Sequence, residues 1–155
     1  AQFVIIGHSE NRENGENDKL INLKIKSALA AKLKVIFCIG ETLNEKRKRR
    51  TQLIISKQIK IGLDGIKNKS NIIIAYEPIW AIGSGIIPKS NDLFQTVKFI
   101  KSKFKGKSPK VLYGGSVNPQ NITNLKEINN LDGFLIGGAS LNAKKFIDIV
   151  KKTYS

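Results

Sequence analysis

Two side chains that could take part in acid–base chemistry each follow a short apolar run in the sequence. Glu77 follows the run Ile72–Tyr76, and His8 follows the run Phe3–Ile6 after one glycine. If the fold brings them together, the carboxylate can act as a general base and the imidazole as a polarising group on a bound molecule. The chain has no other histidine, and nothing in it supports a nucleophilic triad.

Two glycine-rich segments follow later apolar runs and are suited to hold a small anion. They are Gly114-Gly115-Ser116 and Gly137-Gly138. Glycines let backbone N–H groups approach phosphate oxygens, and the Ser116 hydroxyl adds a donor. A helix beginning near Gly138 would direct its positive dipole end at the anion. The two segments therefore predict a phosphate site.

The segment after Glu77 combines large apolar side chains with glycines at its tip. It begins with Pro78 and continues through Ile79, Trp80, Ala81, Ile82, Gly83, Ser84 and Gly85 towards Pro88. A lid that packs shut over a site needs such apolar groups, whereas an ordinary exposed loop does not. We therefore interpret this segment as a lid. The alternative is a strand that ends in a solvated glutamate before an apolar loop.

Five short apolar runs alternate with segments of helical periodicity, which predicts an α/β fold with a parallel sheet. The predicted strands are Phe3–Ile6, Val35–Ile39, Ile72–Tyr76, Lys110–Tyr113 and Gly133–Ile136. Continuous apolar runs of this kind are typical of strands buried on both faces.

Several residues mark where helices begin. A capping box of Thr42 and Glu45 predicts one long basic helix running towards Ile66. Ser90 is the predicted N-cap of a later helix, and Pro119 is predicted to open another. No linker or low-complexity segment interrupts the alternation, so residues 1–155 are predicted to form a single domain.

Every predicted strand ends in glycine or in a polar residue of a functional type. These residues are His8, Glu41, Glu77, Ser116 and the pair Gly137-Gly138. In (β/α)8 barrels this rim carries the chemistry, often with a phosphate site after the last two strands. A doubly wound sheet would place a site at one switch point only. Polar ends on all five strands therefore favour five βα units of a barrel.

Composition excludes several classes of protein. Of the 155 residues, 41% are hydrophobic and 25% are charged, which is typical of a globular domain. No segment approaches the length of a bilayer span or resembles a signal peptide. The only cysteine, Cys38, cannot form an intrachain disulfide, and no metal-ligand cluster surrounds it or His8. We expect a cytoplasmic protein with neither a metal nor a membrane partner.

The net charge of +15 raises the possibility of a nucleic-acid partner. Its densest part is the run Lys46–Arg50. No aromatic side chains are interleaved there for bases to stack on. We therefore interpret the run as a solvated helix face, and we do not favour nucleic acid as the partner.

Five motifs, in the family's order and at close to its spacing, resemble triosephosphate isomerase. They are Ile5–Glu10 (IIGHSE), Cys38–Glu41 (CIGE), Ala75–Gly83 (AYEPIWAIG), Tyr113–Val117 (YGGSV) and Asp132–Leu141 (DGFLIGGASL). Together they span essentially the whole chain. The resemblance implies the interconversion of dihydroxyacetone phosphate and D-glyceraldehyde 3-phosphate in glycolysis and gluconeogenesis, through an enediolate and without a cofactor.

The resemblance also implies roles for individual residues. Glu77 would move the proton between two carbons, and His8 would be a neutral electrophile, an arrangement for which this family is an established example. Glu10 would support the site electrostatically. Tyr113 would latch the closed lid, which runs from Pro78 to about Pro88. The phosphate would be held by Gly83, Ser116, Gly137 and Gly138.

A complete barrel of this type has eight βα units and about 250 residues. The resemblance therefore implies that residues 1–155 are the C-terminal part of a barrel, with three N-terminal units missing. It implies a homodimer for the full-length protein and an inactive fragment. Two alternatives stay open: another phosphate-binding barrel enzyme, and a basic nucleic-acid-binding protein that keeps the fold as a relic.

Overall fold

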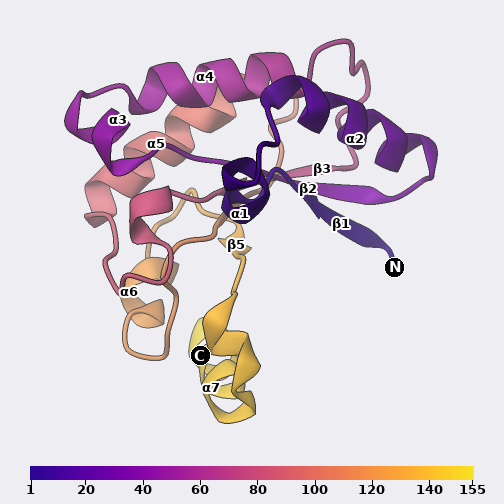
Figure 1. The fold of residues 1–155 in the computed structure, drawn as a ribbon. Coiled ribbons are helices and arrows are strands. Elements are labelled where there is room, and N and C mark those ends of the chain that lie inside the picture. Colours follow the sequence, from indigo (N-terminus) through magenta and orange to yellow (C-terminus); the bar gives the residue numbers. More distant parts are fainter.

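The computed structural model describes residues 1–155 and contains five strands that alternate with helices (Figure 1). The strands are β1 (Phe3–Ile6), β2 (Lys34–Ile39), β3 (Ile72–Tyr76), β4 (Val111–Tyr113) and β5 (Gly133–Phe134). The helices are α1 (Ser9–Glu13), α2 (Asp18–Ala30), α3 (Leu43–Arg47), α4 (Thr51–Gly62), α5 (Ser90–Ser102), α6 (Ile122–Lys126) and α7 (Ala143–Tyr154). Two 3₁₀ turns are η1 (Ile79–Ala81) and η2 (Gly138–Leu141).

The five strands form one parallel sheet in the order β1-β2-β3-β4-β5. Each strand thus pairs with its neighbour in the sequence, and the order never reverses. A doubly wound sheet requires such a reversal. The observed order is that of consecutive units of a (β/α)8 barrel, which confirms the predicted fold class.

The core lies between the sheet and the layer formed by α2, α4 and α5, which lie across one side of it (Figure 1). Fully buried members from the helices are Ile21, Ile25, Ile55, Leu93, Val97 and Ile100, and those from the strands are Val35, Phe37, Ile74 and Val111. The regular spacing of apolar residues along each helix turns one stripe towards the strands. None of the helices combines the length and apolar character needed to cross a membrane.

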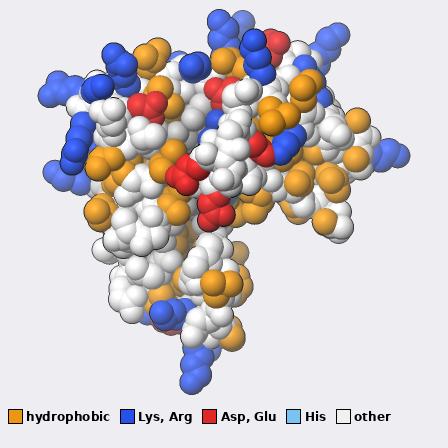
Figure 2. All heavy atoms as spheres, viewed as in Figure 1, with side chains coloured by type: hydrophobic (Ala, Val, Ile, Leu, Met, Phe, Trp, Pro, Cys, Tyr) orange, Lys and Arg blue, Asp and Glu red, His pale blue; other side chains and the backbone are white.

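The prediction that Phe3–Ile6 is a buried strand is wrong. β1 is an edge strand that pairs with β2 alone. Val4 and Ile6 pack on the core, whereas Phe3 and Ile5 are 41% and 45% exposed. The two faces of a strand alternate, and only the face towards the helices is covered here. In Figure 2, hydrophobic side chains are visible in the region where Figure 1 draws β1 and β2.

The predicted long basic helix is two helices. α3 begins with the expected capping box of Thr42 and Glu45. It ends after five residues because Arg49 adopts a left-handed backbone conformation, with φ of 55°. A left-handed residue interrupts the repeating hydrogen bonds of a helix, so the chain turns before α4 starts at Thr51.

Two other predicted helix starts differ from the structure. Ser90 is the first helical residue of α5 rather than its cap, and no side chain caps this helix. Pro119 lies in a turn, and α6 begins three residues later at Ile122. The last predicted strand is also shorter, because β5 pairs with β4 only at Gly133 and Phe134.

The C-terminal helix α7 projects away from the sheet and packs against α6 and η2 (Figure 1). Ile149 is buried, but Phe146 and Ile147 on the same helix are 40% and 52% exposed. The apolar stripe of α7 is therefore only partly covered in this chain.

Candidate active site

The carboxyl ends of the five strands form one rim, because all strands run in the same direction. His8 follows β1, Glu41 follows β2 and Glu77 follows β3. Gly114 follows β4, and Gly137 lies beyond the end of β5. The rim thus gathers the polar and glycine residues that the sequence analysis placed at strand ends.

His8 and Glu77 face each other across the rim. Nε2 of His8 lies 3.6 Å from Oε1 of Glu77. The side chain of His8 is 32% exposed and that of Glu77 is 4% exposed. The separation is too long for a strong hydrogen bond, and it lets both groups contact one small bound molecule.

Close packing fixes Glu77 in place. Its backbone N–H donates to the carbonyl of Ile39 at 2.8 Å, which extends the pairing of β2 with β3 by one residue. A Cβ atom on Gly114 would lie 2.7 Å from Cγ of Glu77, and one on Gly40 would lie 1.8 Å from its carbonyl oxygen. Both glycines are therefore needed for the backbone and side chain of Glu77 to occupy this position.

Burial raises the pKa of Glu77 above its ordinary value. The charge of a protonated His8, the Cys38 thiol and Arg12 lower the pKa in part. The carboxylate atom Oε2 is buried and has no hydrogen-bond partner. A poorly solvated carboxylate with a raised pKa is a stronger base than an exposed one, which suits it to proton abstraction.

The tautomer of His8 is set by the start of α1. Nδ1 accepts a hydrogen bond from the backbone N–H of Glu10 at 3.4 Å, as the N-cap of the helix. An acceptor nitrogen carries no proton, so a neutral imidazole carries its proton on Nε2. His8 therefore presents an N–H donor towards the space beside Glu77.

The carboxylate of Glu10 does not join this pair. Glu10 is exposed in the first turn of α1. Its backbone N–H contacts His8, and its side chain forms no hydrogen bond or ion pair. The position allows a long-range electrostatic effect on the site and no direct contact with Glu77.

The predicted lid is fastened to the rim by Ser116. The Ser116 hydroxyl donates to the carbonyl of Ala81 at 2.6 Å and accepts from the Gly85 N–H at 3.0 Å. The backbone N–H of Ser116 also donates to Ala81, at 2.9 Å. Ser84 adds a hydrogen bond within the segment, from its hydroxyl to the carbonyl of Trp80 at 3.1 Å. The segment is thus folded down on the loop that follows β4.

Tyr113, the predicted latch, is fully buried below Gly115. A Cβ atom on Gly115 would lie 2.2 Å from the Tyr113 hydroxyl, so glycine is required there. The hydroxyl has no hydrogen-bond partner, and burial raises its pKa. In this structure Ser116, and not Tyr113, holds the lid.

The predicted phosphate residues lie in two neighbouring loops and in the lid. Gly137 and Gly138 are exposed beyond β5, which pairs with β4, the strand that precedes Ser116. Gly83 is exposed at the lid tip, with φ of 65°. The helix expected near Gly138 is the single 3₁₀ turn η2, which supplies only a small dipole.

The sequence identified Glu41 only as a polar residue at a strand end, and its contacts were not predicted. Glu41 is 1% exposed. It accepts hydrogen bonds from the Tyr76 hydroxyl at 3.2 and 3.1 Å and from the Trp80 indole N–H at 3.0 Å. The only signal in the sequence was its position at a strand end, which does not reveal a partner 39 residues away.

Arg12 is a second residue whose role the sequence did not reveal. Its guanidinium donates to the carbonyls of Gly7 at 2.8 Å and Cys38 at 3.1 Å, and it forms an ion pair with Asp18 at 2.7 Å. It therefore ties together the ends of β1 and β2, from which His8 and Glu41 project. Cys38 itself is a buried free thiol.

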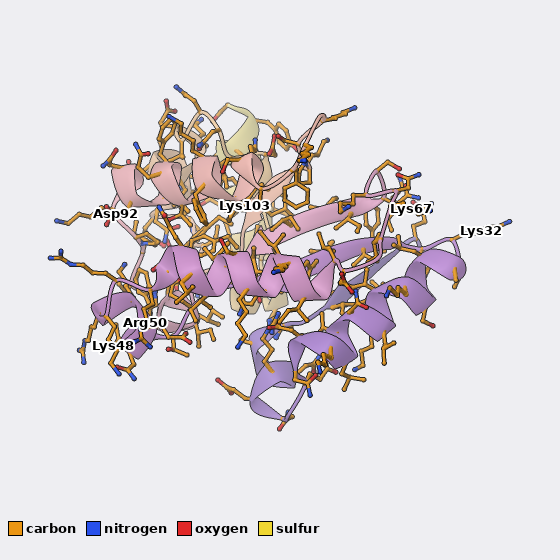
Figure 3. All side chains as sticks on the ribbon, turned by 90° about the horizontal axis from the view of Figure 1, so that it is seen from above. Lys32, Lys48, Arg50, Lys67, Asp92 and Lys103 are labelled. Carbon is orange, nitrogen blue, oxygen red and sulfur yellow. The ribbon has the colours of Figure 1, made fainter.

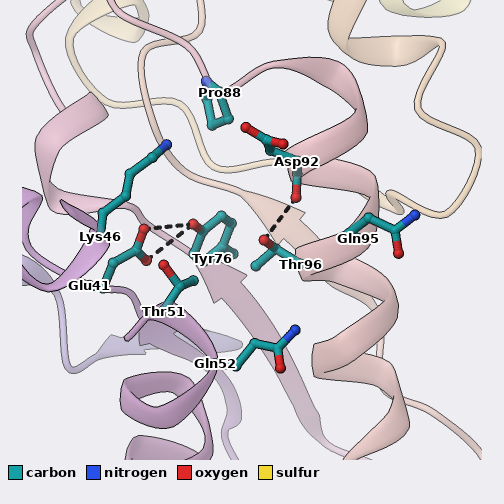
Figure 4. A pocket seen from close by; sticks show the side chains of 9 residues that line it. All are labelled: Glu41, Lys46, Thr51, Gln52, Tyr76, Pro88, Asp92, Gln95 and Thr96. Atoms are coloured by element: carbon teal, nitrogen blue, oxygen red, sulfur yellow. Dashed lines mark hydrogen bonds between the residues drawn. The ribbon is translucent and has the colours of Figure 1, made fainter. Parts of the chain in front are cut away.

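A cavity behind the lid does not contain the pair of His8 and Glu77. It has a volume of about 220 Å³ and lies behind the lid, between α3, α4 and α5, with Glu41, Lys46 and Tyr76 in its wall (Figure 4). The pair of His8 and Glu77 lies instead at the carboxyl ends of β1 and β3.

A parallel sheet of consecutive βα units, with polar side chains and glycines at its carboxyl rim, is part of a (β/α)8 barrel. The comparison of sequences gives the family. The family model described as triosephosphate isomerase matches residues 1–153. The chain belongs to the triosephosphate isomerase family.

Curated relatives carry the same name. The chain is 44% identical over 158 residues to the triosephosphate isomerase of Thermodesulfovibrio yellowstonii, covering 97% of this chain and 64% of the relative. It is 47% identical over 156 residues to that of Pelodictyon phaeoclathratiforme, covering 96% of this chain and 62% of the relative. The chain thus spans less than two thirds of the length of these relatives.

Proposed function

We propose that the full-length protein interconverts dihydroxyacetone phosphate and D-glyceraldehyde 3-phosphate. The observation that carries the proposal is the placement of Nε2 of His8 3.6 Å from the buried carboxylate of Glu77. An aldose–ketose isomerisation needs one base that reaches two adjacent carbons and one donor that reaches two adjacent oxygens. This pair supplies one of each.

The proposed reaction moves one proton out and one back. The Glu77 carboxylate takes the proton from the carbon next to the carbonyl, and the electron pair of that C–H bond becomes the double bond of an enediolate. The Nε2–H of His8 donates to the oxygens as negative charge develops on them. Glu77 then returns its proton to the other carbon, while the proton of the substrate hydroxyl passes through His8 to the neighbouring oxygen and the new carbonyl group forms. Electrons and atoms balance within the substrate, so the proposal requires no cofactor and no metal.

Substrate phosphate is proposed to bind at the lid and the two late loops. Backbone N–H groups of Gly83, Gly137 and Gly138 would hold its oxygens, joined by Ser116 once a donor that now bonds to Ala81 is released. Lid residues 78–85 would exclude water and prevent the enediolate from eliminating phosphate. Tyr113 is proposed to latch the lid once substrate is bound, and Glu10 to act on the site through its charge.

The proposal concerns the full-length protein, acting as a cytoplasmic homodimer on a small phosphorylated triose. An activity assay with D-glyceraldehyde 3-phosphate tests it. The full-length protein should form dihydroxyacetone phosphate without added metal or cofactor, and a Glu77→Gln variant should lose this activity. Absence of isomerisation by the correctly folded wild-type protein would reject the proposal.

A further inference from the structure

Trp80 is held on two sides by the segment that follows β2. The indole N–H donates to Glu41 at 3.0 Å, and Nζ of Lys46 lies 3.5 Å from the centroid of the indole ring. Lys46 is the fourth residue of α3, whose start is fixed by the capping box of Thr42 and Glu45. One short helix thus places a positive charge on the face of the largest side chain in the lid.

The ammonium group of Lys46 has no acidic partner. It forms no ion pair within 4.0 Å, and the nearby Glu41 carboxylate accepts from Tyr76 and Trp80 instead. Lys46 and Glu41 line the same cavity behind the lid (Figure 4). A cation over an indole face is attracted by the negative face of the ring, most strongly where water is excluded. The indole ring is therefore the closest partner of this charge.

The other members of the basic run Lys46–Arg50 behave differently. The four residues from Arg47 onwards are exposed, and Lys48 and Arg50 point away from the helical layer (Figure 3). Lys46 alone is partly buried. The run is thus a solvated surface with one member turned inwards onto the lid.

We infer that Lys46 is a positioning residue that favours the closed position of the lid through its contact with Trp80. Glu41 fixes the edge of the indole and Lys46 fixes its face, so the ring loses both contacts when the lid lifts. Removing the charge should raise the population of the open lid about three- to tenfold. The inference rests on the proposed function only because it treats residues 78–88 as a lid. Its test does not require measurement of catalytic turnover.

The test reads Trp80 directly by fluorine NMR. The 155 residues contain one tryptophan, and in the full-length protein labelled with 5-fluorotryptophan its resonance is assigned with a Trp80→Phe variant. Lys46→Met should shift this resonance and increase the open-lid signal, while Lys46→Arg should keep the wild-type signal. Lys103→Met is the matched control, because Nζ of Lys103 lies 4.0 Å from the ring centroid of Phe99 on α5, away from the lid.

Circular dichroism checks that each variant is folded, and Lys46→Gln serves as a second neutral variant. A wild-type Trp80 resonance and lid population in both neutral variants would overturn the inference. So would an equal loss of the closed lid in Lys46→Arg and Lys46→Met, since arginine keeps the charge. If the wild-type protein had no isomerase activity, the NMR result would still stand, and only the proposed function would be contradicted.

Discussion

Nε2 of His8 and Oε1 of Glu77 lie 3.6 Å apart although different strands carry the two residues. The pair joins a donor fixed by the start of α1 to a carboxylate held by the packing of Gly40 and Gly114. The two side chains form no strong hydrogen bond with each other. Both are therefore available to a substrate, and this availability leads to the following predictions.

Activity should fall as the pH is lowered through the pKa of Glu77. Burial raises this pKa, and only the ionised carboxylate can accept the proton from substrate. We expect kcat/KM of the full-length protein to fall tenfold per pH unit on the acidic side of its profile, with a midpoint above the ordinary glutamate value. A midpoint at or below that value would contradict the assignment of Glu77 as the buried base.

The same raised pKa predicts that Glu77→Gln stabilises the protein at neutral pH. The folded state holds the proton of Glu77 more tightly than the unfolded state, so stability is lost as the pH rises through the folded pKa. Glutamine cannot ionise, so the variant should melt at a higher temperature at neutral pH, and the gain should shrink as the pH is lowered. Glu127→Gln, at an exposed residue after α6, is the control and should change neither the melting temperature at neutral pH nor its dependence on pH.

Gly114→Ala should reduce kcat about 100-fold by displacing the base. The new Cβ would lie 2.7 Å from Cγ of Glu77, so the carboxylate must move. Gly106→Ala is the control, because nothing lies within 4 Å of its Cβ position although its φ of 80° disfavours alanine. The control should lose stability and keep kcat; an equal effect on kcat in both variants would count against steric displacement.

Ser116→Ala should weaken the closed lid. The hydroxyl bridges Ala81 and Gly85, and each lost hydrogen bond costs about 1 kcal/mol. We expect a decrease of about tenfold in kcat/KM and a larger share of turnovers that end in inorganic phosphate, since the enediolate becomes exposed to water. Ser102→Ala on α5, whose hydroxyl bonds only to Phe99, should leave both quantities unchanged.

The 155-residue chain alone should associate through its exposed β1 edge. Phe3 and Ile5 present an apolar face on a strand with a free edge, which favours edge-to-edge aggregation. Size-exclusion chromatography should show that Ile5→Lys increases the monomeric fraction several-fold, whereas Leu23→Lys, at an exposed position on α2 and away from the β1 edge, should not. A wild-type chain that is monomeric and unfolds cooperatively would contradict this expectation.

Much of the fold could be predicted because local patterns decide it. Continuous apolar runs located the strands, and the polar residues behind them located the rim of the sheet. The end of α3 could not be predicted, since helix propensity favours continuation and the left-handed turn at Arg49 is an effect of the fold. The exposure of Ile5 depends on which elements cover the sheet, and an apolar run does not contain that information.

The sequence predicted which residue types form the site better than it predicted their contacts. Residue chemistry singled out His8 and Glu77, and the glycine segments marked the loops around them. The hydrogen bond between Glu41 and Trp80 and the clamp of Arg12 on two strand ends join residues that are distant in the sequence. Such contacts depend on tertiary geometry, so no local pattern reports them.

The most direct test of the proposed reaction follows the substrate proton. The full-length protein is incubated with dihydroxyacetone phosphate in heavy water, and deuterium entering the carbon next to the carbonyl is measured by NMR. We predict rapid incorporation by the wild-type protein and a rate lower by about 1,000-fold or more in Glu77→Gln, with substrate binding retained. Undiminished exchange in Glu77→Gln, or no exchange by the wild-type protein, would contradict the role of Glu77 as the base.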